Sequence, residues 1–161
     1  MKKQLVILWL FVLNISALPA MAANPVWAEN KTDKSYAITV YRSATCGCCK
    51  DWISHLKDHN FLVNDVVVKD VAVHKTRLDV PPQGASCHTA EVNGKVIEGH
   101  VPAQDIKRLL ASESSIRLLT VPGMPSGGPG MDAEGAREDA FKVYSVSTDN
   151  KVGVYQEYSG Y

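Results

Sequence analysis

The sequence lacks the features that mark several large classes of protein. Lysine plus arginine and aspartate plus glutamate each number 17, so no basic excess is present to attract a nucleic acid. The longest uninterrupted apolar run, residues 5–13, falls short of the roughly 20 residues that a membrane-spanning helix needs. The glycine-rich stretch 127–130 lacks the lysine that completes a phosphate-binding loop, and no internal repeat is present. These absences predict a protein with no nucleic-acid partner and no permanent membrane anchor.

The N-terminus has the pattern of a secretory signal peptide. A basic start is followed by the short apolar run and then by small residues at Ala20 and Ala22. We expect a signal peptide over residues 1–22, with cleavage between residues 22 and 28, and a mature protein in the periplasm of a Gram-negative bacterium. Loss of Lys2 and Lys3 would leave the acidic residues in excess by two.

Hydrophobic patterning after the signal peptide predicts alternating strands and helices. Residues 24–35 are polar and are expected to form a loose leader. The elements expected next are a strand at Ala37–Tyr41, a helix at about Gly47–His59, a strand at Phe61–Lys69, a short helix from Asp70 to about Leu78, a hairpin of His88–Val92 and Lys95–Glu98 around Asn93-Gly94, and a helix from Pro102. This order predicts an α/β fold with a thioredoxin-like mixed sheet flanked by helices, over residues 37–111.

The remainder, residues 112–161, is expected to be a C-terminal extension that contributes to the functional site. It begins with a Gly/Pro/Met-rich loop, Val121–Asp132, whose composition disfavours regular structure. Phe141–Ser147 and Lys151–Tyr158 are expected to pair as a β-hairpin.

The first helix has a clear apolar stripe. Its members recur at helical spacing and are Cys49, Trp52, Ile53 and Leu56. Thr45 is expected to cap the N-terminus of this helix. His55 and His59 are spaced to chelate a metal, but they lie off the stripe and are expected to face solvent.

Cysteine is scarce, yet three of the four cysteines lie within Cys46-Gly47-Cys48-Cys49. Neighbouring thiols suit Cu(I) or zinc, or they form a disulfide. Cys46 and Cys49 have the Cys-x-x-Cys spacing of dithiol oxidoreductases, and a position at a helix N-terminus stabilises the thiolate. Cys48 offers a third sulfur that a pure thiol–disulfide enzyme does not need, and that sulfur could bridge two metal ions.

Strand order predicts which residues lie opposite this loop. In a thioredoxin-like sheet the third strand runs antiparallel to the first, which brings Cys87 and His88 beside the cysteines. The fourth strand returns to the same edge and brings His100 there. Four thiols and two imidazoles favour copper, as a multinuclear thiolate-bridged cluster, over a single tetrahedral zinc ion. Met124 and Met131 add soft thioethers in the Gly/Pro loop.

Several segments resemble the CopG-type family of copper resistance proteins. The resemblance covers roughly Tyr41 to Met131. It rests on Thr45-Cys46-Gly47-Cys48-Cys49-Lys50-x-Trp52, Val80-Pro81-Pro82, Ser86-Cys87-His88-Thr89-Ala90, Ile97-Glu98-Gly99-His100-Val101-Pro102-Ala103, Val121-Pro122-Gly123-Met124-Pro125 and Pro129-Gly130-Met131, in this order.

The resemblance implies a periplasmic thioredoxin-like domain that binds copper and interconverts Cu(I) and Cu(II) in support of copper export. The region after the domain is implied to complete the site. Carried over by position, the implied ligands are Cys46, Cys48, Cys49 and Cys87, with His88, Met124 and Met131 as further candidates.

The residues alone are compatible with three functions. The first is a copper oxidoreductase with Cys46 and Cys49 as its catalytic pair and periplasmic efflux components as partners. The second is a metal-free thiol–disulfide oxidoreductase that uses the same two cysteines. The third is a non-catalytic copper carrier or buffer. In each case we expect a monomer.

Overall fold

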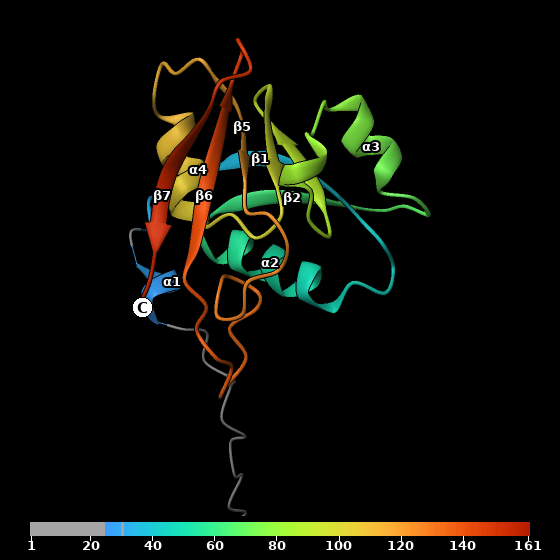
Figure 1. Ribbon diagram of the computed structural model, residues 1–161. Coiled ribbons are helices and arrows are strands. Elements are labelled where there is room, and N and C mark those ends of the chain that lie inside the picture. Colours follow the sequence, from blue (N-terminus) through green and yellow to red (C-terminus); the bar gives the residue numbers. More distant parts are fainter. Residues whose placement is uncertain (1–24, 30) are drawn as a thin grey trace, which may run out of the picture.

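The computed structural model describes residues 25–29 and 31–161 (Figure 1). The expected signal peptide, residues 1–22, lies outside the described residues. Within the described part, no helix is both long enough and apolar enough to span a bilayer.

One seven-stranded mixed sheet forms the centre of the fold, in the order β2-β1-β3-β4-β5-β6-β7. The strands are β1 (Tyr36–Arg42), β2 (Phe61–Val67), β3 (Thr89–Val92), β4 (Lys95–Glu98), β5 (Ile116–Thr120), β6 (Phe141–Ser147) and β7 (Val152–Tyr158). β1 runs parallel to β2 and antiparallel to β3, and β3 runs antiparallel to β4. β5 pairs parallel with β4 and antiparallel with β6.

The helices are α1 (Pro25–Ala28), α2 (Gly47–Asp58), α3 (Ala72–Arg77) and α4 (Ala103–Leu110), with a 3-10 turn at Pro82–Gly84 (Figure 1). α2 buries the apolar stripe that its periodicity predicts. Asp70, the expected N-cap of α3, lies one residue ahead of the N-cap position, which Val71 occupies, although its carboxylate accepts the N–H of Ala72 at 2.8 Å. These elements confirm a mixed α/β fold.

The two faces of the sheet have separate cores because successive strand residues point to opposite sides. Ile97 and Leu119 belong to the larger core, together with residues of α2 and α4. Their neighbours Val96 and Leu118 form a smaller core on the other face, against Leu78 and the segment that follows α3. α2 and α3 therefore lie on opposite faces of the sheet.

The hairpin between β3 and β4 has the predicted turn. Asn93 and Gly94 have φ values of 46° and 73°, the left-handed conformation that a two-residue hairpin turn requires. Because this turn fixes the register, Thr89 pairs with Glu98 at the open end of the hairpin. His88 and Gly99 then follow directly at the same edge of the sheet, beside the end of β1.

Two expectations about the chain are wrong, and one strand is additional to those expected. Thr45 does not cap α2: Cys46 occupies the N-cap position without a side-chain hydrogen bond, and Thr45 is exposed. Residues 24–35 are not uniformly loose, since Trp27 is buried and its indole donates to Gly127 O at 2.8 Å. β5 was not expected, and it joins the predicted hairpin of β6 and β7 to the main sheet.

Candidate metal centre

Six sulfur and imidazole side chains meet where β1 ends and α2 begins. One side consists of the loop cysteines, Cys46, Cys48 and Cys49. The other side, here called the strand-side group, consists of Cys87 and His88 ahead of β3 and His100 after β4. The antiparallel pairing of β1 with β3 and of β3 with β4 brings the second side to the first. This is the juxtaposition that strand order predicted.

The loop cysteines surround the first turn of α2. Cys46 and Cys49 form a disulfide with their Cα atoms 5.3 Å apart, while Cys48 is a free thiol. The Sγ atoms of Cys46 and Cys48 lie 3.6 Å apart. Cys49 is fully buried, whereas Cys46 and Cys48 are half-buried. The loop side therefore combines a disulfide-bonded pair with a half-buried free thiol.

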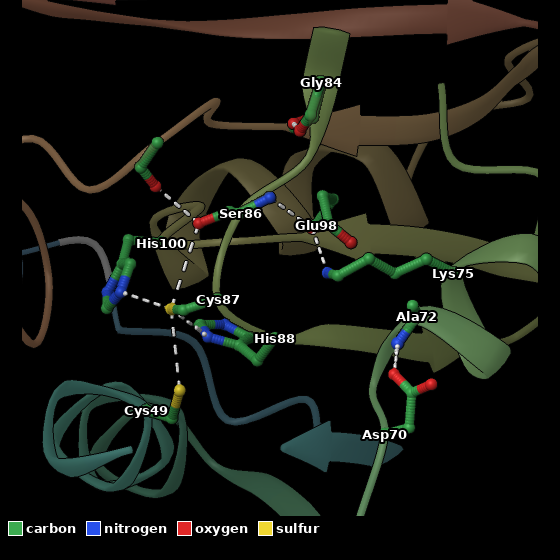
Figure 2. Close-up of polar contacts among 12 residues, drawn as sticks. Cys49, Asp70, Ala72, Lys75, Gly84, Ser86, Cys87, His88, Glu98 and His100 are labelled. Atoms are coloured by element: carbon green, nitrogen blue, oxygen red, sulfur yellow. Dashed lines mark hydrogen bonds and ion pairs between the residues drawn. The ribbon is translucent and has the colours of Figure 1, made fainter. Parts of the chain in front are cut away.

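Cys87 lies between the loop cysteines and the two imidazoles (Figure 2). Its Sγ is 3.5 Å from Cys49 Sγ, 3.3 Å from His88 Nδ1 and 3.3 Å from His100 Nε2. Both histidines are completely buried. The His88 ring also packs against Trp52, with the ring centroids 4.3 Å apart.

His100 is held in one tautomer by the C-terminal extension. Its Nδ1 lies 2.8 Å from the carbonyl oxygen of Pro129. A carbonyl only accepts, so Nδ1 carries the proton and the lone pair of Nε2 faces Cys87. Histidines that bind metals are usually held in this way, with the second ring nitrogen donating to a carbonyl or carboxylate. The orientation of His100 is thus suited to a ligand.

Two overlapping sets of donors have a spacing compatible with a metal ion. Cys46, Cys48, Cys49 and Cys87 bring four sulfur atoms within 4.8 Å of one another. Cys87, His88 and His100 bring one sulfur and two nitrogen atoms within the same distance. Cys87 belongs to both sets. The mixed sulfur–nitrogen position could hold a metal ion as the centre stands, and the all-sulfur position could do so once the Cys46–Cys49 disulfide is reduced.

Burial governs the protonation of the strand-side group. Removal from water, with a smaller contribution from the neighbouring Cys48, raises the pKa of Cys87 to about 11. Burial also lowers the pKa of His88 well below its ordinary value and lowers that of His100, against the opposing hydrogen bond to Pro129. At neutral pH the imidazoles are uncharged and the Cys87 thiol is protonated, so a metal ion must displace that proton.

The C-terminal extension also packs on the loop side. A Cβ atom at Gly130 would lie 2.5 Å from the backbone nitrogen of Trp52 and 2.9 Å from the carbonyl oxygen of Cys48. Gly130 has a φ of +76°, which favours glycine. Through Pro129 and Gly130 the extension contacts both sides of the centre.

The two candidate methionines lie in different surroundings. Met124 is 55% exposed and lines a surface hollow with Phe141 and Tyr144. Met131 is half-buried and lines a second hollow of about 540 Å³ with Trp27 and His55. Neither hollow is lined by a cysteine. The role of these methionines as ligands stays a prediction.

His55 and His59 were expected to face solvent, but His55 is half-buried and His59 is buried. Their rings lie 4.4 Å apart, and His59 is 1% exposed. The N–H of Ala103 donates to His55 Nε2 at 3.0 Å, and His59 Nδ1 donates to the carbonyl oxygen of His55 at 2.9 Å. Burial lowers the pKa of His55 to about 3. Residues far away in the sequence, Trp27 and Met131 among them, line the hollow around this part of α2.

Glu98 is a buried residue near the centre to which no role was assigned from the sequence. Its carboxylate forms an ion pair with Lys75 and accepts the backbone N–H of Ser86 at 2.6 Å. A single acidic residue at the end of the apolar strand Val96-Ile97 was the available signal. The two partners come from distant segments, so the pattern alone did not identify them.

Comparisons with known proteins place this geometry in context. Residues 84–131 match a family model described as a protein of unknown function, DUF411. A solved structure titled copper resistance protein copG, form 2, is 44% identical, with a TM-score of 0.74, and the match covers 78% of this chain and 100% of that chain. Form 1 is 45% identical, with a TM-score of 0.73 and coverage of 79% and 100%. No curated protein matches.

Proposed function

Because the chain belongs to the CopG family of copper resistance proteins, we propose that it binds copper between the loop cysteines and the strand-side group. The observation that carries the proposal is the sharing of Cys87 by a four-sulfur set and a sulfur–imidazole set of donors. Four ligand sulfurs suit Cu(I), and imidazole suits Cu(II) as well. Two neighbouring positions of different softness can retain copper through a change of oxidation state.

The proposed reaction is the interconversion of Cu(I) and Cu(II), with copper as the substrate. Cys46 and Cys49 are the proposed catalytic pair, since they already form a disulfide. Two Cu(II) ions would each accept one electron from the reduced pair, which gives two Cu(I) ions, one disulfide and two protons. A thiol reductant would restore the dithiol by exchange through a mixed disulfide. The opposite direction oxidises Cu(I) and reduces the disulfide.

The proposed ligand set is Cys46, Cys48, Cys49, Cys87, His88 and His100, with Met124 and Met131 as candidates from the extension. A multinuclear thiolate-bridged cluster is the form that four such close sulfurs favour. We assign residues 37–111 to a thioredoxin-like metal-binding domain and residues 112–161 to an extension that completes its site. The contacts of Pro129 and Gly130 with the centre support the assignment of the extension to the site.

In the cell, the proposed role is copper resistance in the periplasm, where the protein would pass copper to efflux components. The signal-peptide pattern at the N-terminus supports this location. A carrier that takes up copper without turning it over would use the same ligands. Turnover of Cu(II) to Cu(I) with a thiol reductant favours the enzyme, and stoichiometric uptake without turnover favours the carrier.

The disulfide itself favours a second candidate, a metal-free thiol–disulfide oxidoreductase. That activity needs Cys46 and Cys49 alone, so it should reduce insulin without metal and should survive Cys48→Ser. Copper chemistry, in contrast, should weaken when Cys48 is replaced.

Anaerobic titration of the reduced protein with copper and zinc tests the proposal. The wild-type protein should bind copper more tightly than zinc, and far more tightly than a Cys48→Ser, Cys87→Ser double variant binds copper. Equal copper affinity of the wild-type and double-variant proteins would refute copper binding at this centre.

A further inference from the structure

Glu98 is a buried carboxylate to which copper binding assigns no direct role. It ends β4, two residues before His100, and its exposed fraction is 0%. Its Oε1 accepts hydrogen bonds from Lys75 Nζ of α3 and from the backbone N–H of Ser86 (Figure 2). A buried carboxylate is costly unless it is paired and hydrogen-bonded. Glu98 has both kinds of partner, and one of them directly precedes Cys87.

The segment around Cys87 precedes β3, which begins at Thr89. Backbone hydrogen bonds hold it at its two ends, where the carbonyl oxygens of Ala85 and His88 accept the N–H groups of Gly123 and Gly99. Between these ends, Ser86 donates its N–H to Glu98 at 2.6 Å and its hydroxyl to Gly123 O. The backbone on which the Cys87 thiol is mounted therefore depends on side-chain and loop contacts.

Gly99 also contacts this segment closely. A Cβ atom at this position would lie 2.6 Å from Ser86 Cβ and 2.6 Å from the carbonyl oxygen of Val121. Ser86 is thus packed directly on the backbone of Gly99 while Glu98 holds its N–H. These contacts limit the movement of Ser86, which precedes Cys87, and Cys87 Sγ lies 3.5 Å from Cys49 Sγ.

We propose that Glu98 is a positioning residue: held by Lys75, it fixes Ser86 and thereby keeps the Cys87 thiol within contact of Cys49 and the two imidazoles. The proposal rests on the proposed function of Cys87 as a copper ligand. A purely stabilising ion pair is the competing explanation. Apolar residues of similar volume often stabilise a core as well as a buried ion pair does, so stability alone gives little reason for charge at this position.

The proximity of Cys49 and Cys87 is measurable without metal. In a Cys46→Ser, Cys48→Ser background only these two thiols remain. They equilibrate with glutathione: two protein thiols and one oxidised glutathione give one protein disulfide and two reduced glutathiones. The equilibrium constant reports how well the two sulfurs are held together. We expect Glu98→Leu to lower it by about tenfold or more, the scale on which the loss of a hydrogen bond to a charged group acts.

Two substitutions at the same position separate positioning from charge. Glu98→Gln keeps an oxygen in the place of Oε1, which accepts the hydrogen bonds of both Lys75 and Ser86. The equilibrium constant for the Cys49–Cys87 disulfide should therefore stay within about threefold of that of the parent protein. Glu98→Asp keeps the charge but withdraws it by one methylene from Ser86. The equilibrium constant for the Cys49–Cys87 disulfide should therefore fall more than it does in Glu98→Gln. The positioning role predicts that Gln retains proximity better than Asp. A stabilising ion pair predicts that Asp retains it at least as well.

Glu91→Leu is the matched control. Glu91 lies on β3 of the same hairpin and pairs with Arg77 and Tyr41, away from the Cys87 segment. Its removal should leave the constant unchanged. If Glu98→Leu does not fold, the equilibrium constants of Glu98→Gln and Glu98→Asp still distinguish a positioning role from a stabilising ion pair. Equal constants for all folded Glu98 variants would overturn the proposal. A normal constant in a protein that fails to bind copper would refute the proposed function and leave this inference standing.

Discussion

The loop cysteines and the strand-side group form opposite sides of one centre, and they are built differently. The loop cysteines come from a few consecutive residues at the start of α2. Two of them are half-buried, and two are joined in a disulfide. The strand-side group comes from two separate segments and has two fully buried imidazoles. Its bonds to Glu98 through Ser86 and to Pro129 fix it from outside the centre.

The difference in burial and bonding suggests that the two sides have different roles in binding copper. The disulfide between half-buried Cys46 and buried Cys49 can meet a reductant at Cys46, and its reduction supplies two more thiols as ligands. Buried groups that are held by surrounding hydrogen bonds keep their geometry while this happens. We therefore expect the loop side to change with redox state and the strand side to provide the constant ligands.

The largest expected effect distinguishes the shared cysteine from an unshared one. Cys87→Ser removes a ligand from both donor sets, whereas Cys48→Ser removes one from the four-sulfur set only. We expect the Cu(I) affinity to fall more than about 100-fold in Cys87→Ser, beyond the effect of losing an outer-shell partner, and about tenfold in Cys48→Ser. Competition with a chromophoric Cu(I) chelator measures both. Equal losses would mean that the two sides do not differ as described.

An intermediate effect is expected where the extension packs on the loop side. Gly130→Ala places a methyl group against backbone atoms of Trp52 and Cys48, which cannot rotate away. We expect a loss of about 2–3 kcal/mol in the free energy of unfolding, from overpacking in addition to the positive φ.

Gly135→Ala is the matched control for this substitution. Gly135 has a similar φ of +77°, but a Cβ there meets no atom within 4 Å. Only the conformational cost of about 1 kcal/mol should appear. Denaturant unfolding of the two reduced, metal-free variants measures the difference. Equal losses would show that the contact with α2 contributes nothing.

The smallest expected effect is the response of the metal-free protein to acid. Burial lowers the pKa of His55 from 6.5 to about 3, so the unfolded chain binds a proton below pH 6.5 that the folded chain does not. Stability is therefore complete above pH 6.5 and falls as the pH decreases toward 3, by about 1.4 kcal/mol per unit for this histidine. Between pH 6.5 and 5.5 the loss should be about 1 kcal/mol.

His55→Gln tests the origin of this loss, because glutamine can still accept the N–H of Ala103. The variant should lose less stability between pH 6.5 and 5.5 than the wild-type protein does. The disulfide-bonded loop cysteines do not titrate and contribute nothing to the slope. An unchanged slope in His55→Gln would assign the acid sensitivity to other groups, such as His88.

The sequence predicted the loop cysteines and the strand-side group because both follow from local rules. Periodicity fixes α2, and Asn93-Gly94 fixes the hairpin that returns His100 to the edge where β1 ends. Antiparallel pairing then leaves little freedom for the position of Cys87.

The features that were missed depend on contacts between distant segments. Trp27 is buried only because Phe141, Tyr158 and Tyr161 surround it. His55 lies off the apolar stripe of α2, and it is half-buried by residues from distant segments, which periodicity within one helix cannot reveal. Glu98 was missed for the same reason, since its partners come from α3 and from the segment before β3.

X-ray absorption at the copper edge of the Cu(I)-loaded, reduced protein shows directly whether both sides of the centre bind copper. A shared centre predicts sulfur-dominated coordination with an imidazole contribution that disappears in a His88→Ala, His100→Ala double variant. It also predicts a lower sulfur count in Cys87→Ser. A spectrum with nitrogen and oxygen ligands only, or one that none of these substitutions changes, would contradict a copper centre that joins the loop cysteines to the strand-side group.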